Sequence, residues 1–279
     1  MRWRRRFSTS PWAATAELAA RLGYVARGLI YISVGLIALL AAAGLAPRAE
    51  GILGSLEAWG EWPPGVVLLW LTGLGLYGFA GWRALQAIAD ADGQGRTPRA
   101  WASRAGQAAS GLVYGGLAIS VFRLLDALED LHKADDQART RAFVTHMLAL
   151  PMGEQLVVGL GLLIVAAGIG NVVRAFVDHF ARNLRCGERT GAWAGAMARV
   201  GYFGRGLAML PGGIFMLAAG WHARASEARS LGDALQGLHT QPMGDLVLSL
   251  VAVGLMAFGG FGFVEAWLRP IRPEGRPAS

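Results

Sequence analysis

Six apolar stretches constrain this chain more than any other feature of its sequence. They run over residues 28–45, 65–80, 105–122, 156–173, 206–219 and 246–264, and charged, turn-rich segments separate them. With their small flanking residues, most offer about 18–20 residues of helix, the length that crosses a hydrocarbon layer of roughly 30 Å. Buried helices of a soluble bundle would carry a polar stripe at the helical period, and residues 28–45 carry none. The sequence therefore predicts an all-α membrane protein with six transmembrane helices.

The basic residues predict how these helices are oriented. The chain has a formal net charge of +7 and a sequence pI near 10.4. If the N-terminus is cytoplasmic, 19 of the 26 basic residues fall on the cytoplasmic side of the six spans. Positive residues are retained on that side of bacterial membranes, so nucleic acid is not needed to explain the charge. We expect a multi-pass membrane protein with both termini in the cytoplasm.

The apolar stretches belong to three tandem copies of one unit. The frame Arg-x-Gly-x-x-x-x-Gly-Leu begins at Arg21, Arg104 and Arg199. Around it we delimit a basic N-terminus (1–9) and three units, 10–92, 97–182 and 190–272. Each unit contains two crossings, so all three have the same orientation. Parallel helical hairpins of this kind predict a pseudo-threefold arrangement about the membrane normal within a single polytopic domain.

Each unit also carries the same local signals. A Ser or Thr near a tryptophan marks the expected cytoplasmic start of each odd span, at Ser10, Thr97 and Thr190. Short apolar phrases at 56–59, 144–147 and 235–238 predict helices in the outer interface. A proline and a glycine follow each phrase and predict a turn into the next span. Glycines within the spans predict close helix contacts.

The repeated Arg-x-Gly-Tyr-x-x-Arg-Gly-Leu phrases, the Pro-Met-Gly turns and the Gly-Leu-rich even spans resemble a bacterial membrane-protein family, domain of unknown function 1206. The resemblance covers nearly everything from Trp12 to Arg269. The second copy departs from the pattern, with Gln107 for Tyr24 and Ser110 for Arg27. The resemblance implies three tandem two-span units in an inner membrane. It implies no activity and no catalytic residues.

The ionisable residues near the cytoplasmic ends of the spans are the candidate functional residues. Ionisable groups within spans are costly, and they mark function by default unless they reach the interface. Three interpretations stay open: snorkelling or pairing with Glu265, a basic pocket for anionic lipid headgroups, and a vestibule for an anionic solute. The candidate lipid-binding residues are Arg27, Arg205, Arg83 and Arg174, the candidate ion-pair partner is Glu265, and Pro211 is a candidate kink in the fifth span.

No catalytic, cofactor-binding or metal-binding residues are predicted. The five histidines fall at or beyond the interfaces, and nucleophile-elbow, phosphate-loop and zinc-protease motifs are missing from the sequence. We therefore predict a noncatalytic accessory or scaffold protein acting through helix–helix and lipid contacts. Its expected partners are membrane lipids, including anionic ones, and a membrane protein or a second copy of itself. The alternative is a small transporter or channel with a path between the three hairpins.

Overall fold

The structure, a computed structural model, is all-helical in the residues it describes, which are 11–60, 63–90, 95, 97–126, 136–178, 180 and 188–269. Six of its helices are long and apolar enough to cross a membrane. This confirms the predicted fold class, a multi-pass membrane protein. The six are α1 (Pro11–Ala42), α3 (Pro63–Ala89), α4 (Pro98–Asp126), α6 (Gly153–Val177), α7 (Glu188–Trp221) and α9 (Gly244–Leu268).

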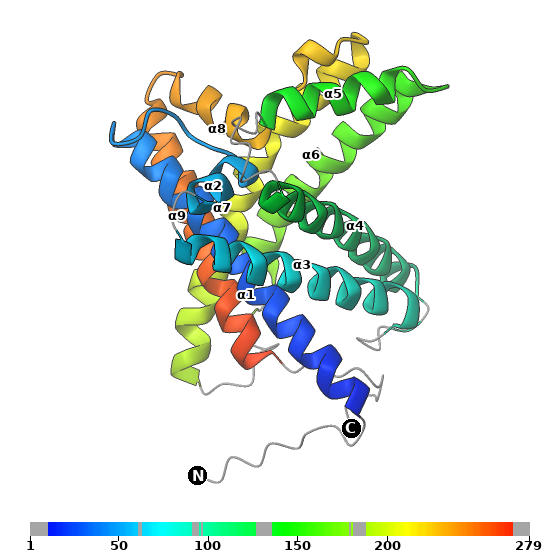
Figure 1. The fold of residues 1–279 in the computed structure, drawn as a ribbon, viewed down its shortest axis with the longest axis vertical. Helices are drawn as coiled ribbons and strands as arrows, with labels where there is room; N and C mark the ends of the chain where they lie inside the picture. Colours follow the sequence, from blue (N-terminus) through cyan, green and yellow to red (C-terminus); the bar gives the residue numbers. More distant parts are fainter. Residues whose placement is uncertain are drawn as a thin grey trace.

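Short helices join the two long helices of each unit. Each predicted interfacial phrase lies inside one of them: α2 (Ile52–Gly60), α5 (Asp136–Leu148) and α8 (Leu231–His239), with a 3-10 turn η3 (Ala225–Glu227) before α8. In Figure 1, α5 and α8 lie at the top, and the first turn of α1 and the last turn of α9 lie at the bottom. Arg21 of α1 donates hydrogen bonds to the carbonyls of Ala266 and Trp267, so those two helix ends are neighbours.

The Pro-x-Gly turns show why glycine is needed where the even spans begin. Met152 and Met243 adopt left-handed backbone conformations, with φ of 61° and 60°. The glycine that follows lies so close to the preceding helix that a Cβ at Gly153 or Gly244 would collide with backbone carbonyl oxygens. In the first unit Pro64 stands at the methionine position, where φ cannot be positive, and α3 starts earlier.

The expected starts of the odd spans have different outcomes. Thr97 caps α4, because its Oγ1 accepts a hydrogen bond from the backbone N–H of Ala100 at 3.2 Å. Thr190 lies inside α7, which begins at Glu188, so the third expected start is wrong by two residues. Ser10 lies outside the described residues.

The helices pair in a cyclic pattern. Each even span packs along the odd span of the following unit: α3 along α4, α6 along α7, and α9 along α1. The two spans of the first unit also pack together, as do those of the third. In the described part of the chain, α4 and α6 do not pack along each other, and they diverge in Figure 1. The spans therefore form a ring in the order α4, α3, α1, α9, α7, α6, with its ends unjoined.

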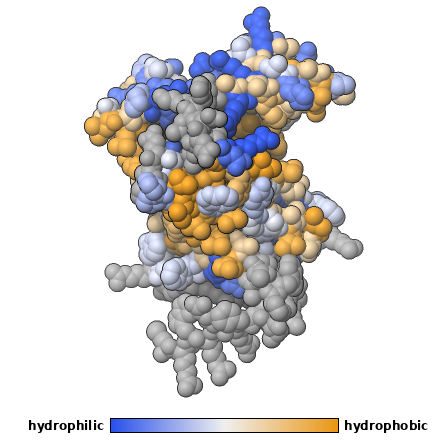
Figure 2. Space-filling view, in the orientation of Figure 1, coloured by the Kyte–Doolittle hydropathy of each residue, from blue (hydrophilic) through white to orange (hydrophobic). Residues whose placement is uncertain are grey.

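Glycines make the closest helix contacts of the ring, as the sequence predicts. A Cβ on Gly204 of α7 would stand 2.5 Å from the Cα of Gly254 on α9, and the reverse distance is the same. Gly28 of α1 faces Gly259 of α9 in a similar way. In a bilayer, small residues let backbones approach and gain dispersion contacts. Figure 2 shows hydrophobic side chains in a band across the middle of the molecule, below a hydrophilic upper end.

Candidate functional site

The candidate functional site is a row of arginine and phenylalanine side chains inside the ring. Arg83, Phe79, Arg27, Phe258 and Arg205 follow one another, and they come from α3, α3, α1, α9 and α7; we call this row the arginine ladder. The guanidinium carbon of Arg83 lies 5.0 Å from the Phe79 ring centroid, and that of Arg27 lies 5.6 Å from it. Arg27 and Arg205 lie 4.9 Å and 4.7 Å from the Phe258 centroid.

Each ring therefore lies close to two cations. Contacts of this kind contribute about 0.5–2 kcal/mol each, more when water is excluded. Both phenylalanines are fully buried. The ladder joins four of the six long helices through contacts that do not require a carboxylate.

Glu265 of α9 neutralises the centre of the ladder. Its carboxylate accepts a hydrogen bond from Arg27 at 2.5 Å and one from Arg269 at 2.8 Å. Arg27 is 3 % exposed and Glu265 is 5 % exposed, so this ion pair is shielded from solvent. A buried charge is stable only when it is paired. Glu265 thus holds α1 against α9 at the cytoplasmic end that the charge distribution predicts.

Arg205 lies at the far end of the ladder without such a carboxylate. Its Nε donates to the hydroxyl of Tyr31 at 3.0 Å. Within the described residues, no Asp or Glu oxygen lies within 4 Å of the Arg205 guanidinium. Its side chain is only partly exposed, in the middle of a long apolar helix.

The internal repeat explains why Arg205 has no carboxylate. Arg27 and Arg205 stand at equivalent positions of the first and third units, and Glu265 is equivalent to Arg174 of the second. Helix α1 packs on α9 as α7 packs on α6. At the position where α9 carries Glu265, the partner of Arg27, α6 carries Arg174, which cannot form an ion pair with Arg205. The side chain of Arg174 is exposed and is not part of the ladder.

Tyr114 brings the second unit to the site. It stands at the position equivalent to Tyr31, and its ring packs edge-on against Phe79 with centroids 4.9 Å apart. The side chain is 5 % exposed, and its hydroxyl lies beside that of Tyr31 without a well-formed hydrogen bond in the described part of the protein. The residue one turn before it, Ser110, replaces the third arginine, and Ala167 replaces the third phenylalanine. The unit lacking these ladder residues is the one whose spans do not pack together.

The sequence-predicted residues are thus divided by the structure. Arg27, Arg205, Arg83 and Glu265 are brought together, and Arg174 is not. Pro211 lies inside α7, six residues after Arg205, and the helix continues on both sides of it. The kink at Pro211 remains a prediction. Phe79 and Phe258 were missed, although they stand at equal distances after the Pro-x-Gly glycines, and aligning the even spans on those glycines would have paired them.

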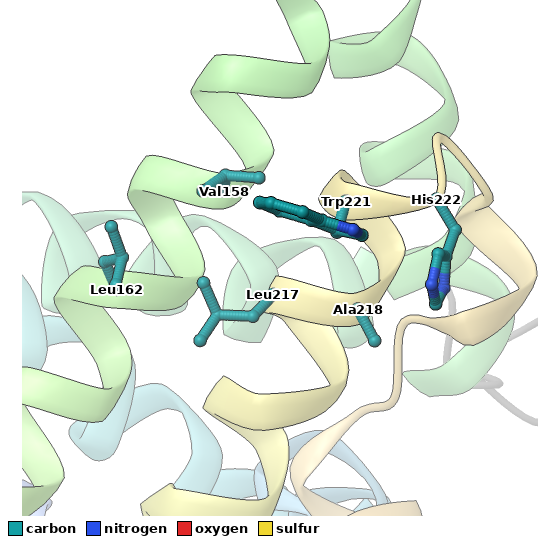
Figure 3. A pocket seen from close by; sticks show the side chains of 6 residues that line it. All are labelled: Val158, Leu162, Leu217, Ala218, Trp221 and His222. Carbon is teal, nitrogen blue, oxygen red and sulfur yellow. The ribbon is translucent and has the colours of Figure 1, made fainter.

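A separate apolar groove lies between α6 and α7, toward their outer ends. It has a volume of about 430 Å³ and is lined by Val158, Leu162, Leu217, Ala218, Trp221 and His222. Figure 3 shows the Trp221 ring beside Val158, with His222 on the far side of Trp221. Its lining holds no catalytic pair, and Trp221 is 80 % exposed, so the groove is part of the lipid-facing surface.

The described residues offer no metal centre, because no group of three or more His, Cys, Asp or Glu side chains gathers among them. Arg21 pairs with Glu17, His222 with Glu227 and His239 with Asp245, and each pair is at least partly exposed. Inside the ring the described residues offer fixed cations, aromatic rings, tyrosine hydroxyls, the Glu265 carboxylate and a few buried amides.

Comparison with known proteins agrees with the repeat. The model of a Domain of Unknown Function (DUF1206) matches the chain three times, at residues 22–90, 105–178 and 200–269. The uncharacterized protein YxxB of Bacillus subtilis (strain 168) is 29 % identical over 261 residues, which cover 92 % of this chain and 91 % of that protein. No solved structure matches. Since the three matches together span most of the sequence, the chain belongs to the DUF1206 family.

Proposed function

We propose that this protein is a noncatalytic subunit of the bacterial inner membrane, which acts as an accessory or scaffold through helix–helix and lipid contacts. The observation that carries the proposal is the unjoined end of the ring at α4 and α6. In their most apolar stretches only 22 % of the residues are buried, against 39–56 % in α1, α3, α7 and α9. Two of the six spans thus present most of their surface to the bilayer.

The exposed faces of α4 and α6 have the composition of a helix–helix interface. Gly116 of α4 and Gly159 of α6 are exposed, and a Cβ on either glycine would meet nothing within 4 Å. Leu112 and Leu163 flank them on the same faces. Many glycines elsewhere in the ring touch a neighbouring backbone, as Gly204 does, although Gly81, Gly195 and Gly212 do not. A transmembrane helix of another subunit, or of a second copy, would find the same small-residue surface here.

The distribution of arginines supports a cytoplasmic location of both termini. An even number of spans places the ends of the chain on one side of the membrane. Arg21, Arg83 and Arg269 all lie near the end of the ring where α1 begins and α9 ends. This end would face the cytoplasm, and α2, α5 and α8 would face outward.

Bulky substitutions on the unpaired faces test the scaffold proposal. We would purify the full chain from native membranes with Gly116→Leu and Gly159→Leu, and with Gly81→Leu as the matched control. A Cβ at Gly81 of α3 also meets nothing within 4 Å, so all three changes leave the ring itself undisturbed. Loss of a co-purifying protein or of a dimer in the first two variants alone supports the proposal. Wild-type protein that runs as a monomer without any membrane-protein partner contradicts it.

A transporter or channel is the second candidate, supported by the cyclic pairing and by a cation inside the ring. The hydroxyl side chains of the spans provide few polar groups for a transport path. Ser120 donates to the carbonyl of Gly116 on its own helix, and Thr72 is buried. Reconstituted vesicles would be assayed for uptake of ions and small anions. Protein-dependent flux that Arg205→Gln abolishes would favour transport, and inert vesicles across the panel would count against it.

A further inference from the structure

We propose that Arg205, Tyr31 and Tyr114 form a binding site for a phosphate group inside the ring, where α4 and α6 leave it unclosed. The inference deepens the proposed action through lipid contacts, on which it rests. It names the chemical class of the ligand, a phosphate oxyanion, and the side chains that hold it.

The first argument is the balance of charge. Four guanidinium groups, those of Arg27, Arg83, Arg205 and Arg269, gather around the ladder and Tyr24. In the described part of the chain, Glu265 is the single carboxylate that forms ion pairs with members of this group. Charges within a low-dielectric interior repel strongly and are costly when unpaired. An anion at the unpaired end of the ladder would offset this excess.

The second argument is that Arg205 is held in place and is not extended toward the interface. Its Nε is fixed by Tyr31, and its guanidinium lies over Phe258. Phe258 precedes the end of α9 at Leu268 by ten residues, which is about 15 Å of helix. A snorkelling arginine would turn its head group to the interface. Arg205 keeps it inside the ring, against Tyr31 and Phe258, where an ionisable group marks a candidate functional site.

The third argument is the set of donors that remains. With Nε bound to Tyr31, the two terminal nitrogens of Arg205 form the pair that a guanidinium presents to two oxygens of one phosphate. The hydroxyl of Tyr114 is buried beside the Tyr31 hydroxyl and makes no well-formed hydrogen bond in the described residues. A buried hydroxyl whose hydrogen bond is poor or missing is costly. A phosphate oxygen held by Arg205 would satisfy it, because Arg205 donates to Tyr31 and the Tyr114 hydroxyl lies beside Tyr31.

Access is the fourth argument. The side chain of Arg205 is partly exposed, although it lies within a transmembrane helix. The ring is continuous from α4 through α3, α1, α9 and α7 to α6, and only its ends are unjoined. A phosphate group could therefore enter between α4 and α6. The group could belong to an anionic lipid headgroup drawn below the interface or to free phosphate.

The experiment uses the full chain, delipidated in neutral detergent, with two probes: phosphatidylglycerol and inorganic phosphate. Binding of each is measured by native mass spectrometry for the lipid and by equilibrium dialysis for phosphate. The variants are Arg205→Gln, Arg205→Lys and Tyr114→Phe. The matched control is Arg123→Gln, which removes an exposed arginine of α4 that lies outside the ladder and outside the candidate lipid-binding residues.

We expect saturable binding of one probe to the wild type and to Arg123→Gln. Arg205→Gln should weaken it at least about tenfold, because a hydrogen bond to a charged group contributes about 1.5–3 kcal/mol. Arg205→Lys and Tyr114→Phe should weaken binding of the probe less than Arg205→Gln does. If Arg205→Gln does not fold, binding to these two variants is the test. Lipid binding alone assigns the site to a headgroup, and phosphate binding alone assigns it to a solute.

The proposal is overturned if the wild type binds neither probe, or if all Arg205 and Tyr114 variants bind as Arg123→Gln does. This outcome is separable from failure of the scaffold proposal. That proposal is read from partner retention in Gly116→Leu and Gly159→Leu, which leave Arg205 and its neighbours intact.

Discussion

The substitution Glu265→Gln tests the centre of the arginine ladder most severely. Glutamine preserves the size of the side chain and removes its charge. In the native protein the Glu265 carboxylate binds Arg27 at 2.5 Å and Arg269 at 2.8 Å, and both members of the Arg27 pair are at most 5 % exposed. The substitution leaves the Arg27 guanidinium buried among aromatic rings with no anion beside it in the described structure.

The size of the effect follows from that burial. Removing one partner of a buried ion pair costs about 3–5 kcal/mol, because the remaining charge stays desolvated. For a chain of about 150–250 residues, 1 kcal/mol lowers the melting temperature by about 2–4 °C. We therefore expect Glu265→Gln to melt roughly 6–20 °C below the wild type. By contrast, Arg269→Gln removes a partner that is 29 % exposed at its side chain and should cost no more than about 1 kcal/mol.

The assay is thermal unfolding in detergent, followed by the fluorescence of the 10 tryptophans. A double variant, Arg27→Met with Glu265→Leu, serves as the control. Replacing both partners of a buried pair by apolar side chains is often neutral, so this variant should recover most of the lost stability. If Glu265→Gln melts within about 2 °C of the wild type, or if the double variant is as unstable as Glu265→Gln, the buried pair does not hold α1 against α9.

Three further predictions concern packing and capping. Gly204→Ala should destabilise the protein by about 1–3 kcal/mol because its Cβ would overlap the backbone of Gly254. Gly81→Ala, the control, should not lower the melting temperature, and equal effects of the two substitutions would contradict this packing. Phe258→Leu should cost more than Phe203→Leu, since it also removes the ring between Arg27 and Arg205; an equal cost in thermal melts would argue against the ladder. Ser230→Ala should remove the side-chain cap of α8, which accepts the N–H of Asp233 at 3.2 Å, and weaken that helix by about 1 kcal/mol. Hydrogen exchange of the first turn of α8 checks it, and unchanged exchange rates would show that the cap is dispensable.

Much of the fold was predictable because its signals are local. The length of an apolar stretch decides whether it spans a bilayer, and the proline and glycine after each interfacial phrase fix where the even spans begin. The apolar stretches alone would make the odd spans too short, but the capping signals place their starts earlier: α1 begins at Pro11, the residue after the expected start at Ser10. Helical backbone continues beyond the hydrocarbon layer, where polarity no longer reports a boundary.

The arrangement of the site was predictable only in part. Depth alone placed Arg27 near Glu265, but depth does not say which helices are neighbours. The contrast between the paired Arg27 and the unpaired Arg205 depends on α1 meeting Glu265 while α7 meets the helix that carries Arg174. The unjoined ends of the ring depend on how α4 and α6 pack over their whole lengths. Such long-range packing has no periodic signature in a single sequence.

Cysteine accessibility tests the central claim, a six-span protein whose arginine-rich end faces the cytoplasm. In a chain with Cys186→Ser, single cysteines would replace Ser226, in the turn before α8, and Gly95, between α3 and α4. A membrane-impermeant maleimide would be added to spheroplasts before and after permeabilisation. The account predicts labelling of Ser226→Cys in intact spheroplasts and of Gly95→Cys only after permeabilisation. The reverse pattern, or labelling of both positions in intact spheroplasts, would contradict it.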